Sequence, residues 1–243
     1  MISKIIFKKI RFNNVNPKNF DKYIVKKGLF VFPAGPALAS INQSNKYYES
    51  LRKADYVFFD SGFFVLLLKF FKNISVKKFS GYKFISLFLD YLKKNKNKSV
   101  FCIDPNLKFS RSNKILFNNL GVKRIYNYLA PKYKTKKLSD KKLLEKIKKI
   151  KPDFIITNIG GGRQEILGLY LKKNLKIKTT ILCTGAAISF VTKDQAPINN
   201  LVDQFYLGWF VRLIFNPFVF LRRYLYSLRL IPMVIFSEIK IIN

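Results

Sequence analysis

The stretch "PDFIITNIGGGRQEI" (Pro152–Ile166) predicts a strand that turns through three glycines into a helix. Phe154–Asn158 is an apolar, β-branched run of strand length, and the residues after the glycines have a helical composition. Small residues let backbone amides and a helix N-terminus face an anion, which makes Gly160, Gly161 and Gly162 candidate phosphate-binding residues. The loop lacks a Walker A ending and the last glycine of G-x-G-x-x-G, and a tight strand-to-helix turn explains it equally well.

The same alternation of strand and helix runs through most of the chain. Further strands are expected at Gly28–Phe32, Asp55–Asp60, Ser99–Ile103 and Thr179–Gly185. Helices are expected at Ala37–Ala54, Gly62–Phe71, from Gly81 onward, and from an N-cap at Ser139 up to Pro152. This pattern predicts an α/β fold of Rossmann-like type, with a mostly parallel sheet covered by helices on both faces. Ligands of such sheets bind beyond the carboxyl ends of the strands.

The alternation stops at about residue 196, which divides the chain into a domain at 1–195 and a basic, aromatic C-terminal appendage at 196–243. A helical stripe in the appendage consists of Leu207, Phe210, Val211, Ile214 and Phe215. This stripe could be buried in the core or lie at a membrane interface, where aromatic residues settle and basic residues meet anionic headgroups. The apolar surface exceeds what one buried stripe needs, which favours membrane contact.

Charge and composition limit the classes of partner and of chemistry. Lys and Arg number 46 against 13 acidic residues, and the net charge of +33 suits nucleic acid, nucleotide phosphates or anionic lipid, although a compositional bias explains much of the surplus equally well. Lys is spread along the whole chain, which argues against a nucleic-acid-binding protein. The absence of histidine excludes imidazole-dependent triads and His-ligated zinc, and two isolated cysteines do not make a disulfide framework.

No signal peptide and no apolar run of spanning length are expected from the sequence, so we predict a cytoplasmic chain.

Four further residues at the expected ligand edge are candidate site residues. Asp60 ends a strand, where its carboxylate could remove a proton from a substrate hydroxyl or simply cap the next helix. Gln164 and Glu165 are polar at the start of an otherwise apolar helix, and they could face a ligand or cap that helix. Gly185 lies in "TGAAISF", a small-residue turn that fits either a ligand or tight packing.

Five segments, in order, resemble the WecG/TagA/CpsF family of glycosyltransferases over about Phe30 to Leu225. The segments are "ADYVFFDSGFFV", "FSGYKFISLFL", "YNYLAPKY", "PDFIITNIGGGRQEI" and "TGAAISFVTKDQAPINNLVDQFYLGWFVRLIFNPFVFLRRYL". The resemblance implies an inverting, metal-independent enzyme that moves an N-acetylmannosamine-type sugar from a UDP donor to a polyprenyl-diphosphate-linked acceptor. The setting would be surface polysaccharide or teichoic-acid-like synthesis at the inner face of the cell membrane. No DxD motif is present, and no cofactor is implied.

By the same resemblance, Asp60 is the general base and Gln164 and Glu165 line the nucleotide-sugar pocket beside the glycine loop. Arg212, Arg222 and Arg223 stand where the family's arginines meet substrate phosphates, a role that guanidinium donors suit. The resemblance leaves homo-oligomerisation open.

The chain departs from the family pattern at several polar positions. The family's Thr-x-Asn is replaced around "FPAGPA", and four single residues differ, namely Lys83, Ser189, Gln195 and Gly208. Two alternatives to an active transferase therefore stand: a catalytically degenerate family member acting as a scaffold, and a basic nucleic-acid-binding protein.

Overall fold

A parallel sheet forms the centre of the computed structural model, which describes residues 2–134, 138–195, 199–204 and 206–243. Within these residues the sheet has nine strands in the order β6-β5-β7-β8-β3-β4-β2-β1-β9. They are β1 (Lys4–Phe7), β2 (Ile10–Asn13), β3 (Gly28–Val31), β4 (Tyr56–Phe58), β5 (Ser99–Asp104), β6 (Arg124–Leu129), β7 (Phe154–Thr157), β8 (Thr180–Cys183) and β9 (Ile239–Ile242). All pairs from β2 to β6 in this order are parallel, and β1 is antiparallel to both of its neighbours.

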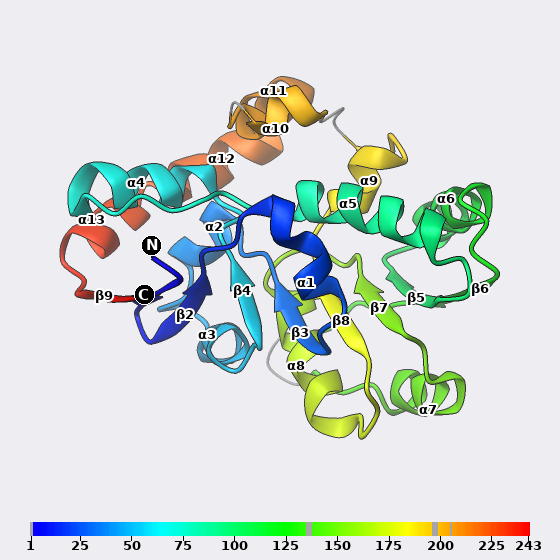
Figure 1. The fold of residues 1–243 in the computed structure, drawn as a ribbon. Coiled ribbons are helices and arrows are strands. Elements are labelled where there is room, and N and C mark those ends of the chain that lie inside the picture. The colour runs from blue at the N-terminus through cyan, green and yellow to red at the C-terminus, as the bar shows by residue number, and fades with distance from the viewer. Residues whose placement is uncertain (1, 135–137, 196–198, 205) are drawn as a thin grey trace.

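Helices cover both faces of the sheet, as the sequence predicted. The main-domain helices are α1 (Phe20–Ile24), α2 (Gly35–Ala39), α3 (Asn45–Arg52), α4 (Gly62–Lys72), α5 (Gly81–Lys94), α6 (Leu107–Asn119), α7 (Lys141–Ile150), α8 (Arg163–Asn174) and α9 (Ala187–Val191), with a 3₁₀ turn at Pro17–Asn19. In Figure 1, β5, β7 and β8 lie between α5 and α9 above and α7 and α8 below. The expected Rossmann-like α/β class is confirmed.

The two-sided burial follows from alternation along each strand. In β3, Leu29 and Val31 pack in the core cluster under α3, α7 and α8, whereas Phe30 packs in the cluster under α1, α5 and α6. On α5, Phe84 and Phe88 are fully buried against this second face, and the helix expected from Gly81 onward is confirmed. Alternate apolar residues along the strands therefore face opposite sides of the sheet, and the apolar stripes of the helices pack against them on each side.

Two local predictions are wrong. Residues 37–54 form two helices, because Ser44 accepts a hydrogen bond from the Tyr47 amide and starts a new helix after a turn. The N-cap of α7 is Asp140, not Ser139, since its carboxylate accepts the Leu143 amide at 2.9 Å. The helix does end before Pro152, with Lys151 in the left-handed conformation.

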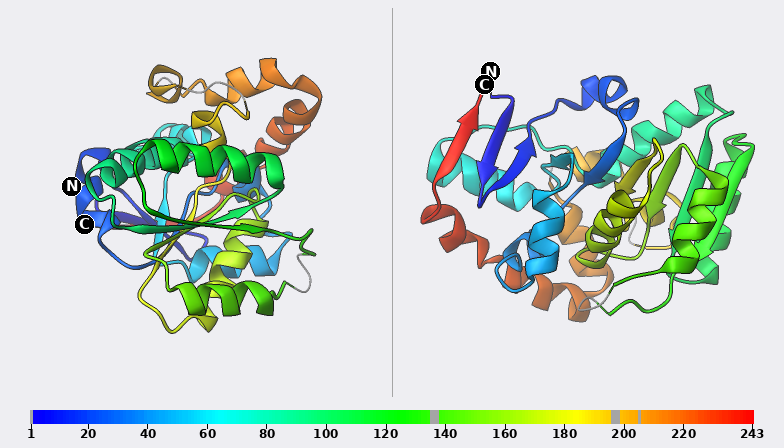
Figure 2. Two further views of the ribbon diagram at one scale, coloured as in Figure 1. Left: turned by 90° about the vertical axis from the view of Figure 1, so that its right-hand side faces the viewer. Right: turned by 90° about the horizontal axis from the view of Figure 1, so that it is seen from below.

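The C-terminal segment contains α10 (Asn200–Gln204), α11 (Gly208–Phe215), α12 (Pro217–Ser227) and α13 (Leu230–Ile235) before β9. Figures 1 and 2 show α10 and α11 outside the layers formed by the sheet and its helices. The segment then returns, because Leu230 and Val234 are fully buried in the core and β9 pairs with β1. The two chain ends consequently lie side by side, with the Ser3 amide donating to the Ile242 carbonyl.

The boundary proposed at 195/196 adjoins residues 196–198, which lie outside the described residues. None of the helices in the described ranges is long and apolar enough to cross a bilayer.

Candidate active site

The order of the parallel strands gathers the predicted site residues at one edge of the sheet. β7, β8, β3 and β4 are consecutive neighbours, and their carboxyl ends lead into the glycine loop, the Gly185 turn, the start of α2 and Asp60. Adjacent loops at this edge are in contact: a Cβ added to Gly161 would lie 4.0 Å from that of Ala37. The site is thus assembled by topology from segments that are far apart in the sequence.

Asp60 does not cap the helix that follows it. Ser61 is the N-cap of α4 and accepts the Phe64 amide at 3.2 Å. The Asp60 Oδ1 atom instead accepts the amide of Gly81, the first residue of α5, at 2.7 Å. Asp60 as a whole residue is half-buried. Its desolvation raises the pKa above the ordinary aspartate value, which the Gly81 amide and the nearby charges of Arg212 and Lys78 partly counteract.

The glycine loop has the backbone conformation that only glycine adopts easily. Gly160 and Gly162 have φ of +86° and +84°, and an added Cβ at either would meet no atom within 4 Å. Conformation, not crowding, is therefore the requirement at these two positions. One loop amide is already engaged, because Gly162 donates to Glu165 Oε2 at 2.6 Å.

Gln164 is buried, with 1% of its surface exposed, and it joins two loops. Its Nε2 donates to Glu165 Oε1 at 2.9 Å and to the Cys183 carbonyl at 3.3 Å, while its Oε1 accepts the Gly185 amide at 2.9 Å. With both of its side-chain polar atoms engaged within the protein, it holds the glycine loop against the Gly185 turn. The sequence placed Gln164 correctly at this edge but did not anticipate that its amide would be used internally.

Glu165 is equally buried and closes the N-terminus of α8. Its side chain accepts the Gly162 amide, which is one half of a capping box. Burial raises the pKa of Glu165 to about 7, against the lowering effect of the Gln164 and backbone hydrogen bonds, and the charge of Asp60 adds to the rise. Tyr47 of α3 is buried beside both carboxyls, and its hydroxyl has no hydrogen-bond partner in the described residues.

The C-terminal arginines differ in how they relate to this edge. Arg212 of α11 lies over the Phe190 ring, with 4.7 Å from its guanidinium carbon to the ring centroid, and its charge acts on Asp60. Burial lowers the pKa of Arg223 below the ordinary arginine value, and the nearby charge of Arg212 lowers it further. Neither forms an ion pair within the described residues. Arg222 is exposed on α12, and the structure does not join it to Asp60.

Sequence reasoning missed one polar group at this edge. Asp203 of α10 binds Lys78 and Ser80, which lie just before α5. The pairing joins positions 123 and 125 residues apart, and periodicity carries no signal for such a contact. Ser80 could have been found, because a Ser before the amphipathic stripe of α5 is a favoured N-cap.

The four positions that depart from the family pattern fall into different environments. Ser189 is buried in α9 and its carbonyl accepts the Gln195 amide. Lys83 lies in the first turn of α5 and its amide is capped by Ser80. Gly208 is the first residue of α11. Lys83 therefore lies in the helix whose first residue binds Asp60, and Gly208 begins the helix that contains Arg212.

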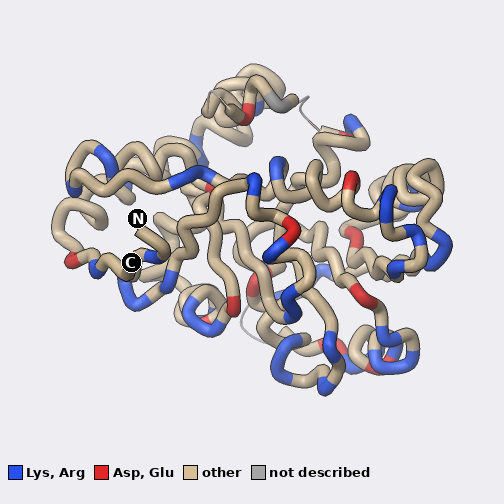
Figure 3. Tube along the Cα trace, in the orientation of Figure 1, with Lys and Arg blue, Asp and Glu red and all other residues tan. Residues whose placement is uncertain are grey.

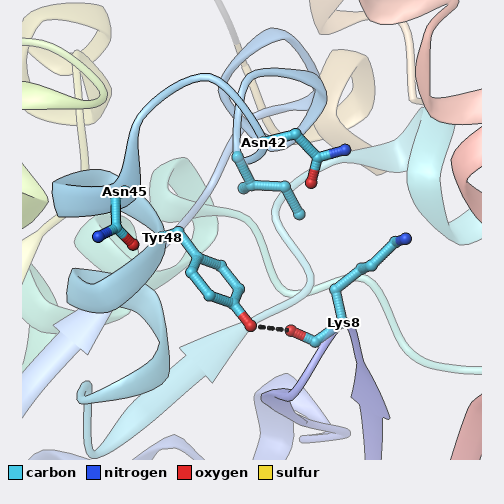
Figure 4. Close-up of a pocket in the computed structure, with 5 residues that line it drawn as sticks. Lys8, Asn42, Asn45 and Tyr48 are labelled. Atoms are coloured by element: carbon cyan, nitrogen blue, oxygen red, sulfur yellow. Dashed lines mark hydrogen bonds between the residues drawn. The ribbon is translucent and has the colours of Figure 1, made fainter.

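A separate surface pocket is lined by Lys8, Ile41, Asn42, Asn45 and Tyr48 (Figure 4). The Tyr48 hydroxyl donates to the Lys8 carbonyl across it at 3.0 Å. Lys8 precedes β2, which runs parallel to β4 with Phe12 opposite Val57. The start of β2 therefore lies at the opposite end of the strands from Asp60, and this pocket is not part of the candidate site.

The fold and this edge combine a Rossmann-like sheet, a strand-end carboxylate, a glycine loop and an arginine-bearing tail. The model of the WecG/TagA/CpsF glycosyl transferase family matches residues 5–241, and the chain belongs to this family of glycosyltransferases. The match covers the C-terminal helices as well as the sheet. A comparison with curated protein sequences gives no match.

Proposed function

We propose that the protein is an inverting, metal-independent transferase of a hexosamine-type sugar, such as N-acetylmannosamine, from a UDP donor to a polyprenyl-diphosphate-linked acceptor. The work would be done at the inner face of the cell membrane, in surface polysaccharide or teichoic-acid-like synthesis. The observation that carries the proposal is the placement of Asp60, a strand-end carboxylate held by the Gly81 amide with the Arg212 charge nearby.

In this reaction the acceptor hydroxyl forms a bond to the anomeric carbon as the bond to the UDP oxygen breaks on the opposite face. The hydroxyl proton passes to the Asp60 carboxylate, which acts as general base. Because its pKa is raised, Asp60 is a stronger base than an ordinary aspartate, and it loses this role as the pH falls through that pKa. Activity should therefore decline on the acid side at a higher pH than an unperturbed aspartate would give.

Arg212 and Arg223 are assigned to the leaving diphosphate, whose negative charge grows in the transition state. Two adjacent guanidinium groups without a carboxylate partner repel each other, and an anion between them removes that cost. The glycine loop, with Gly160 and Gly162 facing open space before α8, is assigned to the donor side. Gln164, Glu165 and Gly185 hold that loop in place.

Membrane association is supported by the exposed apolar surface of α11 and α12. Phe218 is 94% exposed, and the other exposed residues there are Trp209, Phe210, Ile214, Phe215, Val219, Leu221, Leu225 and Leu228. Arg222 and Arg229 are exposed among them, which suits an anionic bilayer surface. Lys and Arg occur in all parts of the chain rather than in one cluster (Figure 3), which gives no support to a nucleic-acid groove.

The test is sugar transfer by purified protein, using a panel of UDP-sugars with a polyprenyl-diphosphate-linked acceptor. A thermal-shift screen first finds the donor, since a ligand that binds the folded state raises its apparent stability. Asp60→Asn should keep donor binding and reduce kcat by about 100-fold or more.

Asp21→Asn, which changes an exposed aspartate on α1, is the matched control and should retain wild-type kcat. Equal turnover by Asp60→Asn and wild type would show that Asp60 is not the base. No binding and no turnover with any donor would instead favour the scaffold alternative.

A further inference from the structure

Asp203 of α10 fastens the C-terminal segment to the chain just before α5. Its Oδ1 accepts Lys78 Nζ at 2.8 Å and its Oδ2 accepts Ser80 Oγ at 2.8 Å, while its backbone carbonyl also accepts Lys78 Nζ at 2.6 Å. The Lys78 and Asp203 side chains are 11% and 17% exposed, so this ion pair is largely withdrawn from water. Lys78 Nζ lies in addition 4.8 Å from the centroid of the Tyr206 ring.

The residues bound by Asp203 lead directly to the group that orients Asp60. Ser80 is the N-cap of α5, accepting the Lys83 amide at 3.1 Å while it donates to Asp203. The next residue, Gly81, donates its amide to Asp60 at 2.7 Å. Because Gly81 is the first residue of α5, this amide has no acceptor within its own helix.

Gly81 is bonded to Ser80 and packs closely against the turn that follows β8. A Cβ at this position would lie 2.8 Å from the Thr184 carbonyl oxygen, so the backbone is held closely against the β8 turn. Because the Gly81 amide belongs to the planar peptide unit that it shares with Ser80, a displacement of Ser80 moves this amide and its hydrogen bond to Asp60.

We propose that Asp203 is a positioning residue for Asp60: by holding Lys78 and Ser80 it fixes the Gly81 amide, and so the docked tail sets the orientation of the Asp60 carboxylate. The inference rests on the proposed function of Asp60 as the base. It adds that the tail contributes to the acceptor side through Asp203, separately from the arginines assigned to the diphosphate.

The first test measures this link without any substrate. Amide hydrogen exchange at Gly81 is followed by NMR in wild type, Asp203→Asn, Asp203→Ala and the control Glu238→Gln. Glu238 is an exposed tail carboxylate whose closest cation is Lys240, at 3.8 Å. If the hydrogen bond between Gly81 and Asp60 is lost, the Gly81 amide should exchange about fivefold faster. We expect this increase for both Asp203 variants and not for the control.

The second test separates positioning from simple stability. Asp203→Asn and Asp203→Ala should lower kcat about tenfold or more, with the KM for the UDP-sugar within about twofold of wild type, because a misplaced base affects chemistry more than donor binding. Asp203→Glu, which keeps the charge, should recover part of the rate. Thermal unfolding of each variant shows whether the fold is retained.

The outcomes distinguish this inference from the proposed function. Unchanged Gly81 exchange in the Asp203 variants overturns the positioning role, whatever the activity. Accelerated exchange with wild-type kcat overturns it as well, since Asp60 would then not depend on Gly81. If wild type transfers no sugar at all, the proposed function fails, and Gly81 exchange alone still decides whether the tail is coupled to Asp60.

Discussion

The side chain of Gln164 binds the Gly185 amide at 2.9 Å, and this contact ties the glycine loop to the neighbouring strand end. Gln164→Glu keeps the shape but places a carboxylate 2.9 Å from Glu165 Oε1 and 3.3 Å from the Cys183 carbonyl. We expect a loss of about 2–4 kcal/mol in the free energy of unfolding, because one buried nitrogen that donates two hydrogen bonds becomes an oxygen that faces two acceptors. Urea unfolding measures it, with the exposed Gln43→Glu as the control.

Glu165 should make stability depend on pH. Its pKa is about 7 in the folded protein and that of an ordinary glutamate when unfolded, so the folded state binds the extra proton between these values. The free energy of unfolding therefore falls as pH rises from about 4.5 to 7, by roughly 3 kcal/mol at most from this group. Glu165→Gln should remove that part of the slope in urea unfolding across pH. An unchanged slope contradicts the raised pKa, and the exposed Glu145→Gln serves as the control.

Gly81→Ala should be destabilising although glycine here has no positive φ. The new Cβ would lie 2.8 Å from the Thr184 carbonyl oxygen and would push the first turn of α5 away from it. Overpacking of this kind costs about 1–3 kcal/mol. Gly161→Ala is the matched comparison, because its Cβ would meet Ala37 at an ordinary 4.0 Å. Similar unfolding midpoints for the two variants would show that the backbone adjusts freely.

The exposed tail residues should govern vesicle binding. Replacing Phe218 by Ser removes an aromatic side chain that is 94% exposed, and we expect about tenfold weaker binding to vesicles that contain phosphatidylglycerol. Val25→Ser, which changes an exposed apolar residue at the end of α1, should leave binding unchanged. Equal vesicle binding by Phe218→Ser and wild type in a flotation assay would argue against α12 as the contact.

Elements with a strong period could be predicted from the sequence. β3, β7 and β8 are short apolar runs between turn signals, and α5 and α7 carry clear apolar stripes. The predictions that these segments are strands and helices, respectively, are therefore confirmed. The β1–β2 hairpin, α6 and β6 were not predicted. β6 is only partly buried along most of its length at the sheet edge, and its mixed composition gives no clean alternation.

At the candidate site, the sequence pattern around each residue predicted its place at the edge of the sheet but not its hydrogen-bond partner. Asp60 and the glycine loop could be placed because strand ends converge at one edge. That Asp60 binds Gly81, that Gln164 spans to Gly185 and that Asp203 reaches Lys78 all depend on contacts between distant segments. No pattern within one segment encodes such pairings, so they required the structure.

The pairing of β9 with β1 bears on how the tail can be removed experimentally. The C-terminal segment is attached to the main domain at both ends: near its start Asp203 binds Lys78, and at its end β9 pairs with β1 in the central sheet. Truncation after residue 195 would strip β1 of its outer partner and leave an unpaired edge open to aggregation. A deletion meant to test the role of the segment should remove α10–α12 alone and rejoin the chain before α13, so that β9 still pairs with β1.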